Sequence, residues 1–137
     1  MNHDQLAQAY FRTTYIVEAP SGTIGLRVGE RNGDLDDLLA ARGMRDWAFI
    51  TAWNPGSFQL PPAENARNNA DLEMRISKGG YQFIPGEGIG DDGAWAPERS
   101  FLVLGIDPAK AMALGRFYRQ RAIVVGTAGG PPELIFC

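Results

Sequence analysis

Apolar and polar residues alternate along some stretches of this chain and recur at helical spacing along others, and each pattern predicts its own kind of element. Residues 13–19 and 23–28 alternate on either side of the turn Pro20-Ser21-Gly22, which predicts an antiparallel hairpin. Residues 47–53 and 100–106 are short, almost continuous apolar runs, typical of strands covered on both faces. We expect these two runs to be adjacent or nearly adjacent strands at the centre of a sheet.

Helices are predicted where apolar residues recur every three or four positions between capping and stop signals. Asp34 is the expected N-cap of a helix that ends at Gly43, and Asp107-Pro108 is the expected start of another that runs to about residue 119. The remaining expected elements are helices at 4–12 and 63–78 and strands at 81–84, 121–125 and 133–136. This order predicts an α/β (α+β) fold in a single globular domain, residues 1–137, with a mixed sheet buried mostly at its central strands and about three packed helices.

The composition fits a globular domain and argues against a nucleic-acid partner. The chain has 137 residues, of which 45% are hydrophobic and 21% charged, and its formal net charge is −3. A nucleic-acid binder gains much of its affinity by neutralising phosphates and usually carries a basic excess. Arg116, Arg119 and Arg121 form a local basic group, but basic residues also collect in the last turn of a helix, which is the simpler interpretation.

The cysteine count and the length of the apolar runs indicate where in the cell the protein is expected. Cys137 is the only cysteine, so no disulfide can form within the chain, as is typical of a reducing compartment. No run approaches the roughly 18 apolar residues of a membrane span, and residues 1–10 lack the apolar core of a signal peptide. We therefore expect a cytoplasmic protein without membrane contact.

Polar residues follow the first central strand at its carboxyl end, where open α/β sheets commonly bind ligands. Asn54 and Ser57 occupy this turn, and the N-terminus of the next helix points toward it. Asn65 and Asn69 continue the apolar stripe of that helix, so we expect both to be buried and to face the 54–57 loop. Either they brace the backbone of the loop, as asparagines often do, or they line a polar pocket.

The segment 86–97 is rich in glycine and is expected to be a mobile connection between two strands. Residues 88–93 formally match G-x-G-x-x-G, but no helix is predicted to follow, so we reject a dinucleotide site. Asp91 and Asp92 lack a third ligand for a hard cation. Trp95, in the same segment, is interpreted either as a lid over a ligand or as a cover for the edge of the core.

Two further polar residues, Glu98 and Ser100, directly precede or begin the second buried strand and are expected to border the same cleft. Glu98 either acts in that cleft or pairs with an arginine such as Arg67. His3 is the only histidine and Cys137 is terminal, which excludes a Ser/His/Asp triad, a Cys/His pair and a histidine-rich metal site. We expect no metal and no cofactor. Any catalysis would have to use Glu98, Asp91, Asp92 or the Asn, Ser and Tyr side chains, and Glu98 is the strongest candidate for a general base.

Several short motifs together resemble a bacterial protein family. They are Thr51-Ala-Trp-Asn-Pro-x-Ser57, Glu64-Asn65-x-Arg67-x-Asn69, and Trp95 with Glu98-x-Ser100-Phe101, with Thr14-Tyr15 near the start and Gln120-x-Ala122-Ile123 near the end. This combination resembles a family of uncharacterised bacterial proteins catalogued as a domain of unknown function. The resemblance covers most of the chain and implies a single-domain bacterial protein, but no activity. The family often has serine or threonine at the cap of the 63–78 helix, where this chain has Pro61-Pro62, so no capping box is expected there.

Two functions remain, and the arrangement of the polar residues distinguishes them. In the first, a small polar ligand such as a nucleotide or metabolite is bound, with Glu98 catalytic if the protein is a metal-independent enzyme. The ligand-binding residues would be Asn54, Ser57, Asn65, Arg67, Asn69, Trp95 and Ser100. In the second, the same side chains are a structural network in a regulatory or protein-interaction module. An open cleft holding Arg67 and Glu98 favours the first, and a closed network favours the second.

Overall fold

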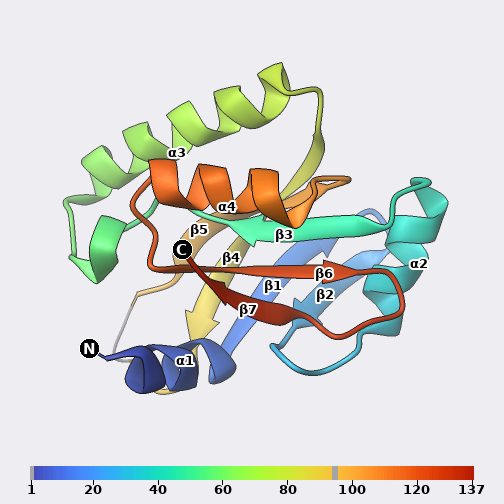
Figure 1. The fold of residues 1–137 in the computed structure, drawn as a ribbon, viewed down its shortest axis with the longest axis horizontal. Helices are drawn as coiled ribbons and strands as arrows, with labels where there is room; N and C mark the ends of the chain where they lie inside the picture. The colour runs from blue at the N-terminus through green and yellow to red at the C-terminus, as the bar shows by residue number, and fades with distance from the viewer. Residues whose placement is uncertain (1, 94–95) are drawn as a thin grey trace.

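A seven-stranded sheet with helices on both faces forms the centre of the protein (Figure 1). The computed structural model describes residues 2–93 and 96–137. Its strands are β1 (Thr13–Ala19), β2 (Gly22–Leu26), β3 (Asp46–Ile50), β4 (Gln82–Gly90), β5 (Glu98–Leu104), β6 (Ala122–Thr127) and β7 (Glu133–Phe136). Its helices are α1 (His3–Phe11), α2 (Gly33–Ala41), α3 (Pro62–Lys78) and α4 (Pro108–Phe117), with a 3₁₀ turn η1 at Pro55–Ser57. The α+β class and the predicted order of elements along the chain are confirmed.

The strand order in the sheet is β2-β1-β4-β5-β3-β6-β7, and every strand pair within the described residues is antiparallel. The predicted neighbours are confirmed, because β5 is the middle strand and pairs with β3 in the register Phe49↔Leu102. The prediction of mixed strand directions among neighbours is wrong for a specific reason. The helices α3 and α4 do join parallel strands, β3 to β4 and β5 to β6, but an antiparallel strand lies between the members of each pair.

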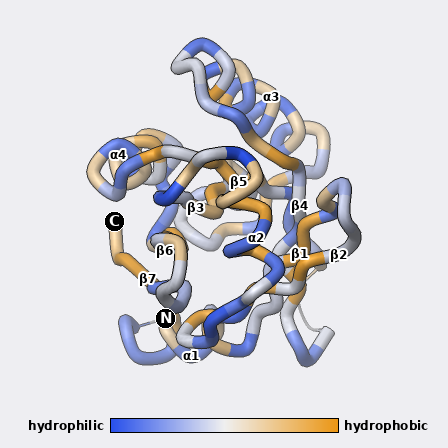
Figure 2. The backbone as a smooth tube through the Cα atoms, turned by 90° about the vertical axis from the view of Figure 1, so that its right-hand side faces the viewer, coloured by the Kyte–Doolittle hydropathy of each residue, from blue (hydrophilic) through white to orange (hydrophobic). Residues whose placement is uncertain are grey.

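Each face of the sheet packs against its own apolar core. On one face, Leu72 and Ile76 of α3 pack over the central strands, together with α4. On the other face, Leu35 and Leu39 of α2 pack against the same strands, and Tyr10 of α1 packs against the margin of this second core. Figure 2 shows that hydrophobic residues are concentrated along the strands between these helices. The second face is thus covered by two separate helices, α2 and α1.

The largest difference from the sequence prediction is the length of β4. The pattern predicts a strand only at 81–84 and a loop at 86–97, but β4 continues to Gly90. Gly88 pairs on both sides, with Tyr15 of β1 and with Glu98 of β5. Glycine offers no side chain to pack and is therefore rare in strand interiors. The strand here is held by backbone hydrogen bonds, which the pattern of apolar and polar residues does not reveal. The predicted loop is wrong over residues 86–90.

Other boundaries differ by a few residues. β3 stops at Ile50, and β5 begins at Glu98 rather than at residue 100. The N-cap of α2 is Asn32, not Asp34, since the Asn32 side chain accepts from the Leu35 N–H at 3.0 Å. α3 follows Pro61 without a side-chain cap, as the comparison with the family motif implies. Among the helices of the described residues, none is both long and apolar enough to cross a bilayer.

Candidate functional site

A cavity of about 360 Å³ opens on the second face of the sheet, between α1 and the ends of the central strands. Its walls come from α1, from β1 and β4, from the end of β3 and from the starts of β5 and β6. The apolar lining consists of Leu6, Ala9, Phe49, Ala122, Ile123 and Val124, and the uncharged polar lining of Tyr10, Thr13, Tyr15, Thr51, Asn54, Ser57, Ser100 and Gln120. The charged lining consists of Arg12, Asp91, Asp92, Glu98 and Arg121.

Alternating glycines leave room for this cavity. In a strand, residues two apart point to the same face, and Gly86, Gly88 and Gly90 therefore share one face of β4. A Cβ built on Gly86 would lie 2.5 Å from the Ile16 carbonyl oxygen and 3.0 Å from the Phe49 ring, so this position requires glycine. A Cβ on Gly88 would lie 3.5 Å from the Tyr15 ring, an ordinary contact. Gly88 lines the cavity, and a methyl group added there would make ordinary contacts without a clash.

The turn after β3 brings an amide to a carboxylate at the edge of the cavity. Asn54 adopts a left-handed backbone conformation, with φ 48°, which asparagine tolerates better than most residues. Its Nδ2 donates to Oε2 of Glu98 at 3.2 Å. Its Oδ1 accepts from the Leu60 N–H at 3.0 Å and from Nδ2 of Asn65 at 2.7 Å. Because Oδ1 is held by two donors, the Nδ2 of Asn54 is oriented toward Glu98.

The two asparagines of α3 brace the chain behind the cavity. Asn65 accepts from the Asn54 N–H at 2.8 Å, and Asn69 accepts from the Ala52 N–H at 2.9 Å. The Nδ2 of Asn69 also donates to the Arg99 carbonyl at 2.9 Å. Asn65 and Asn69 are 1% and 7% exposed, which confirms their predicted burial against the loop. Their hydrogen bonds hold the loop after β3 to the start of β5, as the bracing interpretation predicts.

Two tyrosines on the α1 side of the cavity carry phenols that stay protonated. The Tyr10 hydroxyl donates to the Ala122 carbonyl at 3.0 Å. Burial raises the pKa of Tyr10 strongly, the negative charges of Glu98 and Cys137 raise it further, and Arg121 lowers it. Burial also raises the pKa of Tyr15, with Tyr10 and Glu98 adding to the effect and a hydrogen bond with Thr13 opposing it. Both phenols are therefore neutral hydrogen-bonding groups near neutral pH.

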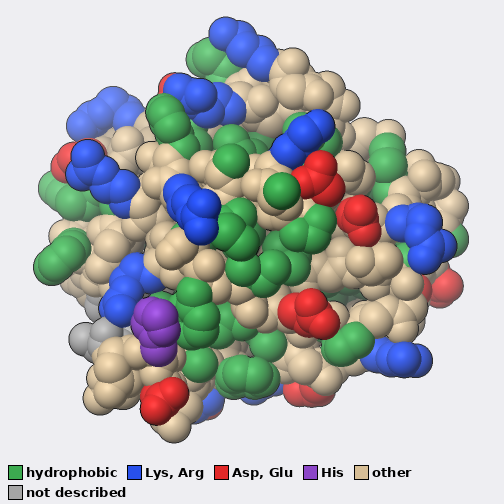
Figure 3. Space-filling view, in the orientation of Figure 1, with side chains coloured by type: hydrophobic (Ala, Val, Ile, Leu, Met, Phe, Trp, Pro, Cys, Tyr) green, Lys and Arg blue, Asp and Glu red, His purple; other side chains and the backbone are tan. Residues whose placement is uncertain are grey.

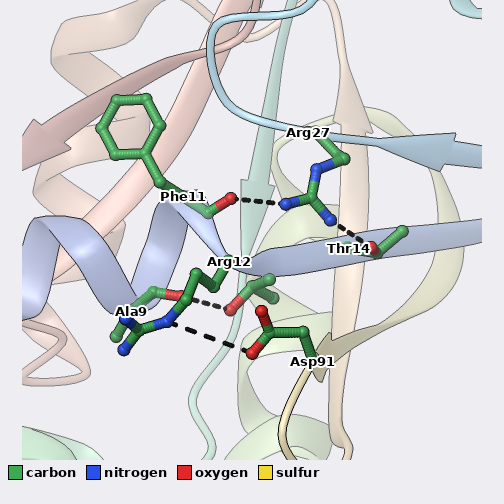
Figure 4. Close-up of polar contacts among 7 residues, drawn as sticks. Ala9, Phe11, Arg12, Thr14, Arg27 and Asp91 are labelled. Carbon is green, nitrogen blue, oxygen red and sulfur yellow. Dashed lines mark hydrogen bonds and ion pairs between the residues drawn. The ribbon is translucent and has the colours of Figure 1, made fainter.

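The rim of the cavity joins α1 to β1 and β4 (Figure 4). Arg12, directly after α1, lies 4.0 Å from Asp91, and both side chains are about half exposed. The Thr13 hydroxyl donates to the Ala9 carbonyl at 2.7 Å and so provides a hydrogen-bond partner for a carbonyl in the last turn of α1. Arg27 of the neighbouring hairpin donates to the Phe11 carbonyl at 2.9 Å. These contacts place the last turn of α1 beside the cavity mouth.

The structure brings together some of the residues predicted for the site and separates others. Asn54, Ser57, Glu98 and Ser100 line the cavity, whereas Asn65 and Asn69 lie behind it. Arg67 is exposed, since it lies two residues from each asparagine and so about 200° around α3 from them. The cleft therefore holds Glu98 without Arg67. Trp95 lies outside the described residues.

Sequence reasoning missed the part of the site that α1, β1 and β6 supply. Tyr10, Tyr15, Gln120 and Arg121 line the cavity, although they are far from Glu98 in sequence. One feature of the sequence does indicate a cavity here. Glycines alternate at 86, 88 and 90, and this spacing leaves one face of a strand without side chains. Thr14-Tyr15 and the segment from Gln120 were also among the motifs that carry the family resemblance.

Charged side chains outside the cavity are spread over the surface. Figure 3 shows Lys and Arg side chains over α3 and α4 with apolar and uncharged groups between them. Arg75 of α3 lies 3.4 Å from Asp71, and its guanidinium lies 3.9 Å from the centre of the Phe117 ring. Within residues 2–93 and 96–137, no three His, Cys, Asp or Glu side chains come together in an arrangement that could hold a metal ion.

The comparison with protein families shows which family the chain belongs to. A family model described as "Protein of unknown function (DUF3293)" matches residues 50–123, just over half of the sequence. The chain belongs to this family. The part matched by the DUF3293 model runs from the end of β3 into β6 and includes Asn54, Asn65 and Glu98, whereas α1 and β1 precede it. Comparisons with curated proteins and with solved structures gave no match.

Proposed function

We propose that the cavity beside α1 binds a small polar metabolite and that Glu98 is the side chain that recognises it. One observation carries the proposal: a carboxylate held by Asn54 faces a cavity whose floor is cleared by glycines of an inner strand. The volume of about 360 Å³ is near the lower end of ligand pockets, which favours a ligand of amino-acid or nucleoside size. A carboxylate accepts about four hydrogen bonds, enough for a ligand donor as well as for Asn54.

Glu98 also supports a metal-independent reaction in this cavity. The cavity around the carboxylate is lined partly by neutral phenols and apolar side chains, and a carboxylate held in a fixed orientation can accept a proton without a metal. Asn54 fixes its position through a hydrogen-bonded chain that begins at Asn65 of α3. If the bound molecule is transformed, Glu98 is the group placed to act as a general base.

A regulatory or protein-interaction module is the second candidate, and one observation favours it. Asn65 and Asn69 direct their hydrogen bonds to the loop and to β5 rather than into the cavity. That network stabilises the fold whether or not a ligand binds. Ligand binding is preferred because Glu98 and Ser100 line an open space.

The proposal includes a cytoplasmic location in a bacterial cell. It is supported by the single cysteine of the chain, which is typical of a reducing compartment, and by the bacterial character of the family that the motifs resemble. The net charge of −3 favours a small-molecule ligand over a nucleic acid.

A thermal-shift screen against nucleosides, nucleotides, amino acids and sugars tests the proposal. A ligand present at 1,000 times its Kd stabilises the folded state by about 4 kcal/mol. We expect at least one of these classes to raise the melting temperature of the wild type, and to raise that of Glu98→Gln much less. A screen in which no class stabilises the wild type contradicts the proposal.

A further inference from the structure

Two oppositely charged residues line the cavity on opposite sides of β3. β5 and β6 both pair with β3 in antiparallel fashion, so both begin at the same end of the sheet. Glu98 is the first residue of β5, and Arg121 directly precedes β6. Neighbouring strands are about 4.8 Å apart, so the two backbones are separated by about 10 Å. Both side chains line the same cavity, with the end of β3 between them.

The electrostatics of Tyr10 support this arrangement. Apart from burial, the charges that change its pKa are those of Glu98 and Cys137, which raise it, and Arg121, which lowers it. The phenol of Tyr10 therefore interacts electrostatically with both the Glu98 and the Arg121 charge. An arginine carries five N–H donors and a carboxylate about four acceptor sites, so each can bind a ligand in addition to its contacts within the protein.

Part of the cavity wall is apolar. Phe49 of β3 and Val124 of β6 belong to the core on this face of the sheet and also line the cavity. Leu6 of α1 also contributes to the apolar part of the wall. A ligand that contacts both Glu98 and Arg121 can therefore also place an apolar group against this part of the wall.

We propose that the ligand is a zwitterion of the α-amino-acid class, with its ammonium group at Glu98, its carboxylate at Arg121 and an apolar side chain against Phe49 and Val124. This assignment rests on the proposed function of the cavity. Polyphosphates fit less well, because the charged lining contains three acids, Asp91, Asp92 and Glu98, against the two bases Arg12 and Arg121. The cavity volume of about 360 Å³ also favours a single small molecule.

Titration calorimetry with blocked analogues tests the assignment. The probes are L-leucine, L-methionine and L-phenylalanine, the methyl ester of each, which lacks the carboxylate, and the N-acetyl form of each, which lacks the ammonium group. We expect at least one free amino acid to bind at least tenfold more tightly than either of its blocked forms, since each blocked form loses one charge-assisted contact.

Two variants assign the ends of the ligand. Glu98→Gln is expected to weaken the binding of the free amino acid. In this variant the free amino acid should no longer bind more tightly than its N-acetyl form, but it should still bind more tightly than its methyl ester. Arg121→Gln is expected to show the reverse pattern. Arg116→Gln, which changes an exposed arginine in the last turn of α4, is the matched control and should bind as the wild type does. The ratio of affinities within each variant is informative even if stability changes.

The outcomes separate this inference from the proposed function. If none of the three amino acids binds but a nucleoside or sugar binds and is sensitive to Glu98→Gln, the zwitterion assignment is overturned and the proposed cavity function stands. If an amino acid binds without discrimination against both blocked forms, the assignment is overturned as well. If no small molecule binds, both proposals fail.

Discussion

The Nδ2 atom of Asn54 donates to Oε2 of Glu98 across 3.2 Å, which joins the turn after β3 to the first residue of β5. The amide has this orientation because its oxygen is occupied by Leu60 and Asn65. The carboxylate is therefore positioned by a helix that does not itself reach the cavity. This relationship connects the buried asparagines of α3 to the candidate ligand site.

The substitution Glu98→Gln should leave the fold nearly intact. Glutamine keeps an oxygen that accepts from Asn54, so this hydrogen bond loses its charged character but is not broken, at a cost of about 1 kcal/mol. We expect the melting temperature to fall by roughly 3–5 °C, measured by circular dichroism. A loss of 3 kcal/mol or more would instead indicate a carboxylate with a mainly structural role and would favour the module interpretation.

Asn65→Ala should destabilise the protein far more than the neighbouring change Asn68→Ala. The substitution removes the acceptor for the buried Asn54 N–H and a donor to the Asn54 side chain, so we expect a loss of about 2–4 kcal/mol in urea unfolding. Asn68 is partly exposed on the same helix, and its removal should change stability by about 0.5 kcal/mol or less. Equal effects at both positions would show that Asn65 does not brace the loop.

Alanine should have opposite effects at two glycines of β4. At Gly86 the added Cβ meets the Ile16 carbonyl oxygen at 2.5 Å, and we expect a loss of about 1–3 kcal/mol. At Gly88 the nearest atom is 3.5 Å away, so alanine is tolerated and can stabilise by about 0.4–1 kcal/mol through the unfolded chain. Chemical denaturation of Gly86→Ala and Gly88→Ala compares the two. A cost at Gly88 as large as at Gly86 would mean that no open space lies over Gly88.

Alkaline pH should destabilise the protein through its buried tyrosines. Burial raises the pKa of Tyr15 in the folded state above its usual value of about 10, so the folded state holds this proton more tightly than the unfolded chain. The stability that Tyr15 contributes is complete below pH 10 and decreases as pH rises from about 10 toward the folded-state pKa. Unfolding free energies measured between pH 8 and 11 should fall above pH 10.

The variant Tyr15→Phe should make that fall less steep by about 1.4 kcal/mol per pH unit, the value for one linked proton. Tyr10 and Tyr118 also have raised pKa values, so part of the slope remains in this variant. An unchanged slope would show that Tyr15 takes no part in the alkaline transition.

The sequence predicted most of the fold because its strongest local signals agree with the tertiary structure. The apolar runs ending in Trp53 and Ile106 overlap most of the central strands β3 and β5, and Asp107-Pro108 begins α4 as expected. The burial of Asn65 and Asn69 followed from helical spacing alone. These features depend on neighbours within one element, which a single sequence displays directly.

The remaining features depend on contacts between distant segments. The extension of β4 to Gly90 is stabilised by pairing with β1 and β5 on either side, which no local propensity reports. The insertion of antiparallel strands between parallel ones is likewise a property of the whole sheet. Tyr10 and Arg121 enter the candidate site only because α1 and β6 meet there, as the hydrogen bond from Tyr10 to Ala122 shows.

If the cavity over Gly88 is a ligand site, a side chain that fills it must prevent binding. Gly88→Val places methyl groups in the cavity without a backbone clash, and Gly25→Val makes the same change on the edge strand β2, where the added Cβ lies 3.4 Å from Thr14. The measurement is the increase in melting temperature produced by the metabolite that best stabilises the wild type. We expect Gly88→Val to remain folded and to lose this increase, while Gly25→Val retains it. A Gly88→Val protein that is stabilised as strongly as the wild type would show that the ligand does not bind over Gly88.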